Sequence, residues 1–189
     1  EILLGDGIQS VQATSDGSIW TSFFDEGIFG NFGWNDPVGA SGLVAWDVEG
    51  NKLYDFQPID DLDSICDCYA LNVESDADVW LYYYTEFPLV HLHHRQVQSV
   101  WNMSIKGSDS FAVAGHRVLF RGEYDDPDIY HLFALNSNGN IKLLKQLQIS
   151  DETGQKITAE RVVGRGNSLY ILSNSSVYRV DVSSVESTL

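Results

Sequence analysis

Acidic side chains recur directly after the second strand of a repeated hairpin pattern. Asp25 and Glu26 follow "IWTSFF", Glu86 follows "VWLYYYT", and Asp125 stands in "GEYDD". Oxygen-rich clusters of this kind bind divalent cations such as calcium, and carboxylates held close together acquire raised pKa values suited to proton transfer. A metal held by Glu26, Glu86 and Asp125 would make the protein a hydrolase, lactonase or lyase. The alternative is that these acids are solvated loop residues in a very acidic chain.

The histidine run "HLHH" is a second group with metal-binding chemistry. On a strand, His91 and His93 lie on the same face, a spacing that can chelate a metal, and Cys66, Cys68 and His116 would be further ligands. Structural zinc sites use paired ligands with loop spacing, which "CDC" does not have. We therefore expect half-exposed strand residues here and no cofactor, with a divalent cation at the acidic positions as the alternative.

A sequence repeat accounts for the regular recurrence of the acidic positions. The stretch "VQATSDGSIWTSFFDE" (residues 11–26) returns as "LNVESDADVWLYYYTE" (residues 71–86), and looser copies occupy residues 111–126 and 161–176. Each copy reads as strand, tight turn, strand, because short runs rich in β-branched and aromatic residues flank turn-forming residues. A further hairpin follows the first three copies, whereas the last copy lacks its fourth strand. The residues shared by the first two copies are Ser15 and Ser75, Asp16 and Asp76, Trp20 and Trp80, and Glu26 and Glu86.

Four-stranded units that recur every 40 to 60 residues or so are typical of β-propeller blades. We predict an all-β protein of about four four-stranded antiparallel meanders, with blades at about residues 8–61, 66–104, 107–150 and 158–189 and with residues 1–5 as an outer strand. These blades would belong to a larger propeller or to one completed by a second copy. The alternatives are a closed four-bladed ring, in which residues 1–5 complete the last blade, and a β-sandwich.

The phrase "DGSIW", in which Trp20 opens the second strand after an Asp-Gly turn, resembles the bacterial propeller repeats of the NHL, two-component-regulator and streptogramin-lyase type. The resemblance covers about sixteen residues of each blade and is clear in copies one and two, whereas Leu119 and Leu169 replace the Trp in copies three and four. It implies a propeller fold. Propellers of this type include lyases, lactonases, sensor domains and scaffolds, so the resemblance implies no single activity.

Net charge and cysteine usage restrict the partners and the compartment. With 11 Lys+Arg against 27 Asp+Glu, the formal charge of −16 would repel nucleic acid and anionic membrane surfaces. We expect a protein or small-molecule ligand as partner, together with a homo-oligomer or missing upstream blades. Cys66 and Cys68, as free thiols, favour a reducing compartment and a cytoplasmic location. The chain begins at Glu1 and not at Met, so removal of an upstream segment and secretion remain open.

The loop "FFDEGIFGNFGWNDPVGASG" (residues 23–42) is too long for a hairpin connection and rich in Phe and Gly. On a propeller face it would form a lid or one wall of a pocket, and the alternative is that its aromatic residues pack on a neighbouring blade. Because the chain has neither a Gly-x-Ser-x-Gly elbow nor a phosphate-binding glycine loop, we predict a non-catalytic binding or sensing module. The alternatives are the metal-dependent enzyme and a structural interaction domain. The predicted ligand-binding residues are Phe24, Asp25, Glu26, Phe29, Trp34, Tyr84, Glu86 and Asp125.

Overall fold

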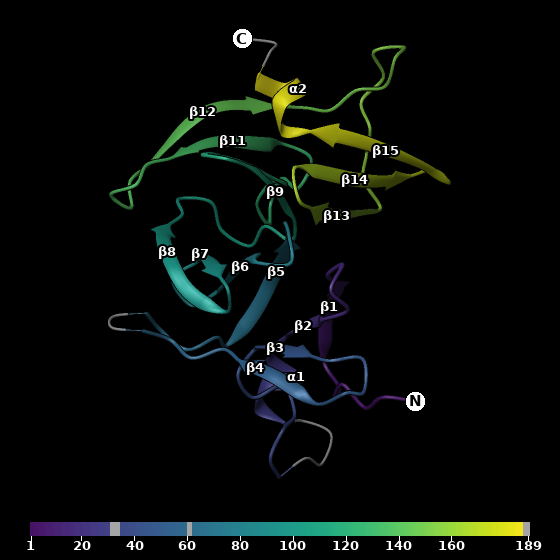
Figure 1. Cartoon of the computed structure of the whole chain (residues 1–189). Helices are drawn as coiled ribbons and strands as arrows, with labels where there is room; N and C mark the ends of the chain where they lie inside the picture. Colours follow the sequence, from purple (N-terminus) through teal and green to yellow (C-terminus); the bar gives the residue numbers. More distant parts are fainter. Residues whose placement is uncertain (31–34, 60–61, 187–189) are drawn as a thin grey trace. The chain divides into compact units, whose positions relative to one another are not determined.

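The structure, a computed structural model, describes residues 1–30, 35–59 and 62–186. The strands form four antiparallel sheets, in the orders β1-β2-β3-β4, β5-β6-β7-β8, β9-β10-β11-β12 and β13-β14-β15 (Figure 1). The chain divides into two compact units, Glu1–Val100 and Trp101–Leu189, which we call unit 1 and unit 2. Both helices within the described ranges have five residues, too few to cross a lipid bilayer.

Unit 1 contains the first two sheets and one short helix. Its elements are β1 (Ile8–Ala13), β2 (Ile19–Phe23), α1 (Asp25–Phe29), β3 (Leu43–Trp46), β4 (Lys52–Asp55), β5 (Asp67–Val73), β6 (Asp78–Tyr84), β7 (Pro88–His93) and β8 (Gln96–Asn102), which ends just beyond the unit.

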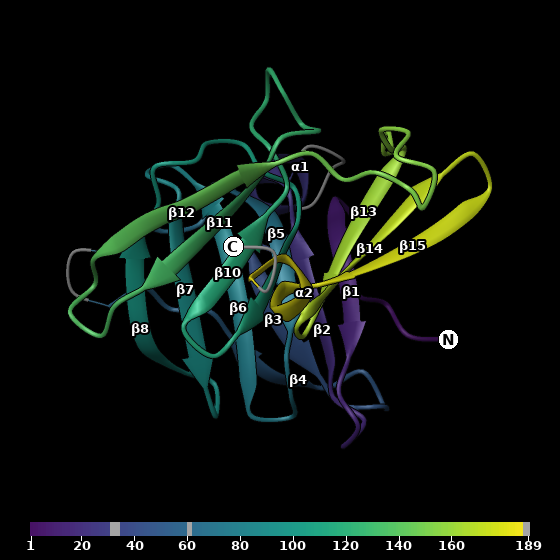
Figure 2. The ribbon, with the colours of Figure 1, turned by 90° about the horizontal axis from the view of Figure 1, so that it is seen from above.

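Unit 2 contains the other two sheets. Its elements are β9 (Phe111–Ala114), β10 (Arg117–Phe120), β11 (Tyr130–Leu135), β12 (Ile141–Leu147), β13 (Arg161–Arg165), β14 (Ser168–Ser173), β15 (Ser176–Asp181) and α2 (Val182–Glu186). Figure 2 shows β13, β14 and β15 side by side.

The strand register confirms the sequence repeat. In the first three sheets, the residue that takes the place of Trp20 stands opposite the corresponding residue of the first strand, whereas in the fourth sheet Leu169 stands two residues further along, opposite Gly164. The pairs in the first three sheets are Trp20 with Gln12, Trp80 with Asn72, and Leu119 with Ala112. The prediction of consecutive all-β meanders is therefore correct, and each sheet lies within one of the expected blade ranges.

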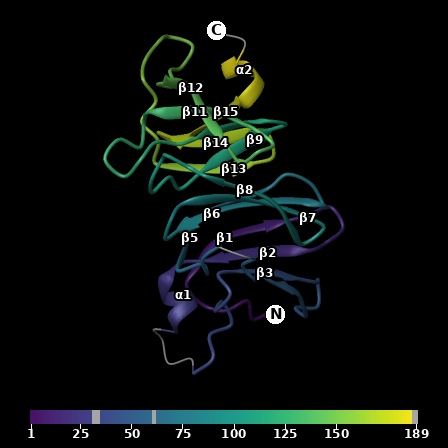
Figure 3. The ribbon, with the colours of Figure 1, turned by 90° about the vertical axis from the view of Figure 1, so that its left-hand side faces the viewer.

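Within unit 1, the first two sheets share one hydrophobic core and lie against each other (Figure 3). The ring of Phe56, after β4, meets the ring of Tyr83, in β6, edge-on at 6.0 Å between centroids. The buried side chain of Gln12 also reaches the neighbouring sheet, because its amide donates to the carbonyl O of Leu71 at 2.8 Å and accepts from the N–H of Val73 at 3.0 Å. This packing of separate sheets is what the blade prediction requires, since a single continuous sheet would place the two Trp strands edge to edge.

Unit 2 repeats this arrangement with its own core. The hydroxyl of Ser110 donates to the carbonyl O of Val162 at 2.7 Å, and the N–H of Val113 donates to the carbonyl O of Gly166 at 2.9 Å. Val182 and Val185 of α2 are buried in the same core. The short helix therefore covers apolar surface at the end of β15.

The prediction of an outer strand at residues 1–5 is wrong. This segment has no strand conformation, although "ILL" is apolar. Gly5 and Gly7 have φ values of 101° and 60°, which turn the chain out of an extended path before β1 begins. Leu3 is 66% exposed. Among the described residues, the sheet β13-β14-β15 consequently has three strands where the other three sheets have four.

Candidate functional site

A cavity of about 360 Å³ opens in unit 1 where β4 ends and the chain runs on towards β5. One wall comes from the end of the long loop before β3, and the opposite wall comes from the segment before β5. Its lining residues are Ala40, Ser41, Asp55, Phe56, Gln57, Pro58, Ser64 and Ile65. The lining thus combines an apolar floor with several side chains that form hydrogen bonds.

The carboxylate in this cavity is partly neutralised. The Nζ of Lys52 donates to Oδ1 of Asp55 at 2.8 Å and lies 3.2 Å from the carbonyl O of Val38. The hydroxyl of Ser41 is 3.3 Å from the same Oδ1 and 3.0 Å from the carbonyl O of Leu43. These contacts orient Asp55 and Ser41 without removing the oxygen acceptors from the cavity wall, because a carboxylate accepts several bonds.

Gly42 allows the two walls to approach. Its φ is 76°, and a Cβ at this position would lie 2.4 Å from the Cβ of Ile65. The N–H of Gly42 donates to the carbonyl O of Gly39 at 2.8 Å, which closes the turn before β3. Ile65 is 3% exposed, so the segment before β5 packs directly on this glycine turn.

The carboxylates of Asp25 and Asp67 are close enough to interact electrostatically. Burial, and the negative charge of Asp25 at the start of α1, raise the pKa of Asp67 to about 6. Asp67 stands opposite Tyr84 in the pairing of β5 with β6. The structure therefore brings Asp25 and Tyr84, both predicted site residues, near Asp67, which sequence reasoning did not select.

Helix α1 holds Asp25 in place. The N–H of Phe24 donates to the carbonyl O of Gly7 at 2.9 Å, which ties the start of the helix to the segment before β1. Gly27 lies directly on that segment, since a Cβ there would be 2.5 Å from the carbonyl O of Asp6. The sequence predicts a loop here, because five residues are too few to show helical periodicity.

The other predicted residues lie apart from the cavity. Phe29 is 67% exposed and Tyr84 is 44% exposed, Glu86 is exposed in the turn after β6, and Asp125 is exposed in unit 2. Trp34 lies outside the described residues. The cavity lining includes none of the seven predicted residues that the structure describes. Its signal in the sequence was the eleven-residue connection "FQPIDDLDSIC" between β4 and β5, which is also longer than a usual turn.

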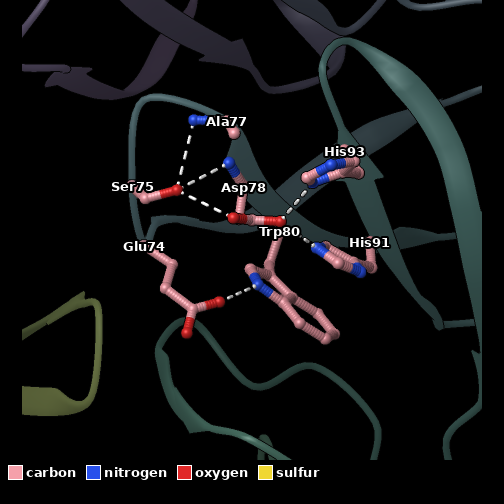
Figure 4. Close-up of polar contacts among 7 residues, drawn as sticks. All are labelled: Glu74, Ser75, Ala77, Asp78, Trp80, His91 and His93. Atoms are coloured by element: carbon pink, nitrogen blue, oxygen red, sulfur yellow. Dashed lines mark hydrogen bonds and ion pairs between the residues drawn. The ribbon is translucent and has the colours of Figure 1, made fainter.

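The predicted histidine pair forms a polar cluster with Asp78 (Figure 4). Nε2 of His91 and Nδ1 of His93 lie 2.9 Å and 2.8 Å from the same Oδ1 of Asp78, and the hydroxyl of Ser75 donates to Oδ2 at 2.8 Å. Burial opposes ionisation of Asp78, but the hydrogen bonds from His93, Ser75 and His91 outweigh it and lower the pKa of this carboxyl. His91 and His93 lie on the same face of β7, as predicted. On that face they contact Asp78 of the neighbouring strand β6.

Trp80 completes this face. Its ring stacks on the ring of His91 with 4.0 Å between centroids and 11° between planes. Its Nε1 donates to Oε2 of Glu74 at 2.8 Å (Figure 4). Trp80 and His91 are directly opposite in the pairing of β6 with β7, so the stack stabilises the sheet of blade two.

Neither cysteine forms a disulfide, as predicted from the "CDC" spacing. Cys68 is fully buried, and this burial raises the pKa of its thiol to about 12. Cys66 is half-buried. Within residues 1–30, 35–59 and 62–186, no three His, Cys, Asp or Glu side chains gather as a metal-binding group.

The fold defines the protein as a β-propeller protein made of consecutive antiparallel blades, three with four strands and one with three strands among the described residues. The chain aligns over 95% of its length with the structure of a streptogramin B lyase, at 12% identity and a TM-score of 0.51. At this identity the likeness establishes the fold and no activity. The chain belongs to the YxzG family, whose sequence profile matches residues 43–180.

Two other solved structures align with the chain. The extracellular domain of the one-component system BT4673 from B. thetaiotaomicron aligns over 95% of this chain, with 10% identity and a TM-score of 0.46. A glucose dehydrogenase aligns over 90%, with 13% identity and a TM-score of 0.46. The alignments cover 56% of the lyase chain, 21% of the BT4673 chain and 59% of the dehydrogenase chain. No curated protein matches the sequence.

Proposed function

We propose that the protein is a non-catalytic binding module for a small polar molecule, which is held in the cavity between the long loop of blade one and the segment before β5. The observation that carries this proposal is the cavity itself. Its volume of about 360 Å³ falls within the range of roughly 300–1,000 Å³ that is usual for ligand pockets. Its lining pairs an apolar floor, Phe56 and Ile65, with polar groups that would orient a ligand.

The lining also indicates the class of ligand. Asp55 accepts hydrogen bonds only, whereas Ser41, Ser64 and Gln57 donate and accept. The formal charge of −16 opposes the approach of anions over long distances. A neutral or cationic molecule with hydroxyl or amine donors therefore fits this cavity better than an organic acid does.

Ligand-observed NMR with a small library of polyols, amines and carboxylic acids tests the proposal. We expect binding by members of the first two classes, loss of that binding in Ser41→Trp, which fills the cavity, and weaker binding in Gln57→Ala, which leaves the packing intact. Ser104→Trp places the same ring on an exposed site of unit 2 and should bind as the wild type does. A library without binders, or binders unaffected by both cavity variants, would show the proposal to be wrong.

One observation favours a second function, catalysis by a general acid or base. The pKa of Asp67, about 6, lies close to neutral pH, where a carboxyl group can both release and accept a proton. In this alternative, Asp67 exchanges the proton, and its burial together with the charge of Asp25 keeps its pKa high. Mass spectrometry of each NMR binder after incubation with the protein would detect a product, and Asp67→Asn should abolish its formation. Binders that are recovered unchanged would favour the non-catalytic module.

A further inference from the structure

The sheet of blade four ends on its third strand. Among the described residues β15 is the last strand of that sheet, whereas β3, β7 and β11, the third strands of the other blades, each pair with a fourth strand. Figure 2 shows β15 at the outside of the group formed by β13, β14 and β15. An edge of this kind presents backbone groups that can pair with a further strand.

The exposure of β15 differs from that of the equivalent strands. β3 and β11 are buried at every residue, and β7 is buried at four of its six residues. β15 has no buried residue. Val177 is 68% exposed, and Leu172, which stands opposite it on β14, is exposed as well. The third strand of a blade is thus an interior strand where a fourth strand is present, and β15 has the exposure of an edge strand.

The backbone of β15 has hydrogen-bonding groups directed away from β14. The two-residue turn at 174–175 has positive φ at both positions, so the two serines that flank it are a hydrogen-bonded pair. Because the bonding direction alternates along an antiparallel strand, the N–H and C=O groups of Val177 and Arg179 point to the open edge. The N–H of Val182, which belongs to the other series, donates to the carbonyl O of Asn167 at 3.0 Å and agrees with this alternation. In the part of the chain that the structure describes, β15 pairs with β14 alone, so a fourth strand can take all four groups.

The core beside β15 can accept the side chains of such a strand. Tyr178 and Val180 alternate with the edge-directed residues and are partly buried against the core of unit 2. Leu144 and Leu147 of β12, the fourth strand of blade three, are partly buried against the same core. A fourth strand on blade four would therefore extend this core with apolar side chains at alternate positions, beside Tyr178 and Val180.

The charge of the chain decides between two kinds of occupant. A second copy would bring another formal charge of −16 to the contact, and the two copies would repel each other. A strand that carries Lys or Arg is attracted instead. On β15 itself, Nε of Arg179 lies 2.8 Å from Oδ1 of Asp181, and this ion pair leaves the edge without a local charge that opposes a basic strand. β12, with the sequence "IKLLKQL", combines lysines with core-facing leucines in this way.

We infer that β15 binds an extended, basic segment of another protein, which adds a fourth antiparallel strand to blade four. Backbone hydrogen bonds to Val177 and Arg179 hold this segment, and its alternate apolar side chains pack beside Tyr178 and Val180. The site lies wholly in unit 2, so the inference is independent of the cavity and the function proposed for unit 1.

A synthetic peptide with the sequence of residues 140–148, "NIKLLKQLQ", serves as the probe, with both ends blocked. It is titrated into the ¹⁵N-labelled full chain and followed by the backbone amide signals. We expect the signals of residues 176–180 to shift, with a Kd below about 1 mM, and the amide hydrogens of Val177 and Arg179 to exchange more slowly. A peptide in which Glu replaces both lysines should bind at least about tenfold more weakly.

Variants of the protein and of the peptide separate strand addition from general attraction. Val177→Pro removes one edge-directed N–H and leaves the bonds to β14 intact, so it should fold and bind the peptide about tenfold more weakly or less. Val177→Thr keeps that N–H and a similar shape, and should bind within about threefold of the wild type. N-methylation of alternate peptide amides should abolish binding for the series that faces β15 and preserve it for the other series.

Four results would overturn the inference. The first is a folded Val177→Pro protein that keeps its affinity, and the second is equal binding by the two N-methylated peptides. The third is a peptide that shifts no signal of β15, or that shifts β4, β8 and β12 as strongly as β15. The fourth is a protein that, without peptide, is a dimer in solution with the amides of β15 protected from exchange.

Discussion

Ser15 binds the carboxylate of Asp76, a residue of the next blade, through two hydrogen bonds. Its N–H donates to Oδ1 and its hydroxyl donates to Oδ2, both at 2.6 Å. The two residues belong to the repeated turns "SDGS" and "SDAD". The repeated Ser-Asp pair thus links neighbouring blades, with the Ser of one turn bonded to the Asp of the following turn.

A double-mutant cycle with Ser15→Ala and Asp76→Ala should show a coupling free energy of about 0.5–1 kcal/mol, because the bonds are exposed to solvent. Urea unfolding of the four proteins measures it. The matched control is the cycle of Ser75→Ala with Asp16→Ala. Ser75 bonds to Asp78, and Asp16 accepts from Thr14 and Ser18, so each stays within its own turn and their coupling should be near zero. Equal coupling in both cycles would contradict the specific link.

Asp78 should make unit 1 sensitive to acid. Its folded-state pKa lies below the ordinary value of 3.8, so its contribution to stability is present above that value and is lost as the pH falls through the folded-state pKa. Asp78→Asn should therefore lower the free energy of unfolding at pH 6 and show a smaller further loss between pH 4 and pH 2 than the wild type. Asp125→Asn, at an exposed position of unit 2, should follow the wild-type curve. Parallel curves for Asp78→Asn and the wild type would refute this role.

Asp67 should change the pH dependence of stability in the direction opposite to Asp78. Its pKa is raised to about 6, so the folded state binds its proton more tightly than the unfolded chain does, and stability falls as the pH rises from about 4 to 6. Asp67→Asn should be more stable than the wild type at pH 8, by on the order of 1 kcal/mol after solvent screening, and the difference should vanish below about pH 4. An NMR titration of the Asp67 carboxyl in Asp25→Asn should give a lower pKa than in the wild type. An unchanged pKa would remove Asp25 as a cause.

Gly27→Ala should destabilise the protein by about 1–3 kcal/mol, measured by urea unfolding. In an ordinary helix this change stabilises by about 1 kcal/mol, but here the added Cβ would lie 2.5 Å from the carbonyl O of Asp6. Phe29→Ala is the control in the same helix, since Phe29 is 67% exposed and its loss should change stability by less than about 0.5 kcal/mol. A stabilised Gly27→Ala protein would mean that α1 does not pack closely on the segment before β1.

The blade pattern was predictable because each blade repeats the same local rules. Alternation and turn residues fixed the strands around Trp20 and Trp80, and the register places Leu119 in the equivalent position even though the Trp is lost, whereas Leu169 is displaced by two residues along the first strand. The outer strand at residues 1–5 was not predictable in this way. Apolar composition favours a strand, but the positive φ values of Gly5 and Gly7 decide the path of the chain.

The candidate site was predictable only in part. The repeat indicated that acids such as Asp25 follow the second strands, but it gave no reason to select Asp67, whose pKa depends on burial and on a charge contributed by another blade. The cavity depends on Gly42 meeting Ile65, a contact between segments that follow no repeat. Side-chain burial of this kind is a tertiary property, and periodicity does not encode it.

Because Cys68 is buried, a thiol-reactive spectroscopic label would attach selectively to Cys66. A thiol reacts with maleimides as its thiolate, and a fully buried thiol whose pKa is raised to about 12 supplies almost none at neutral pH. Cys66 is the more accessible of the two and precedes Asp67 directly. A fluorophore coupled there would report on the carboxylate pair beside α1 without any engineered cysteine.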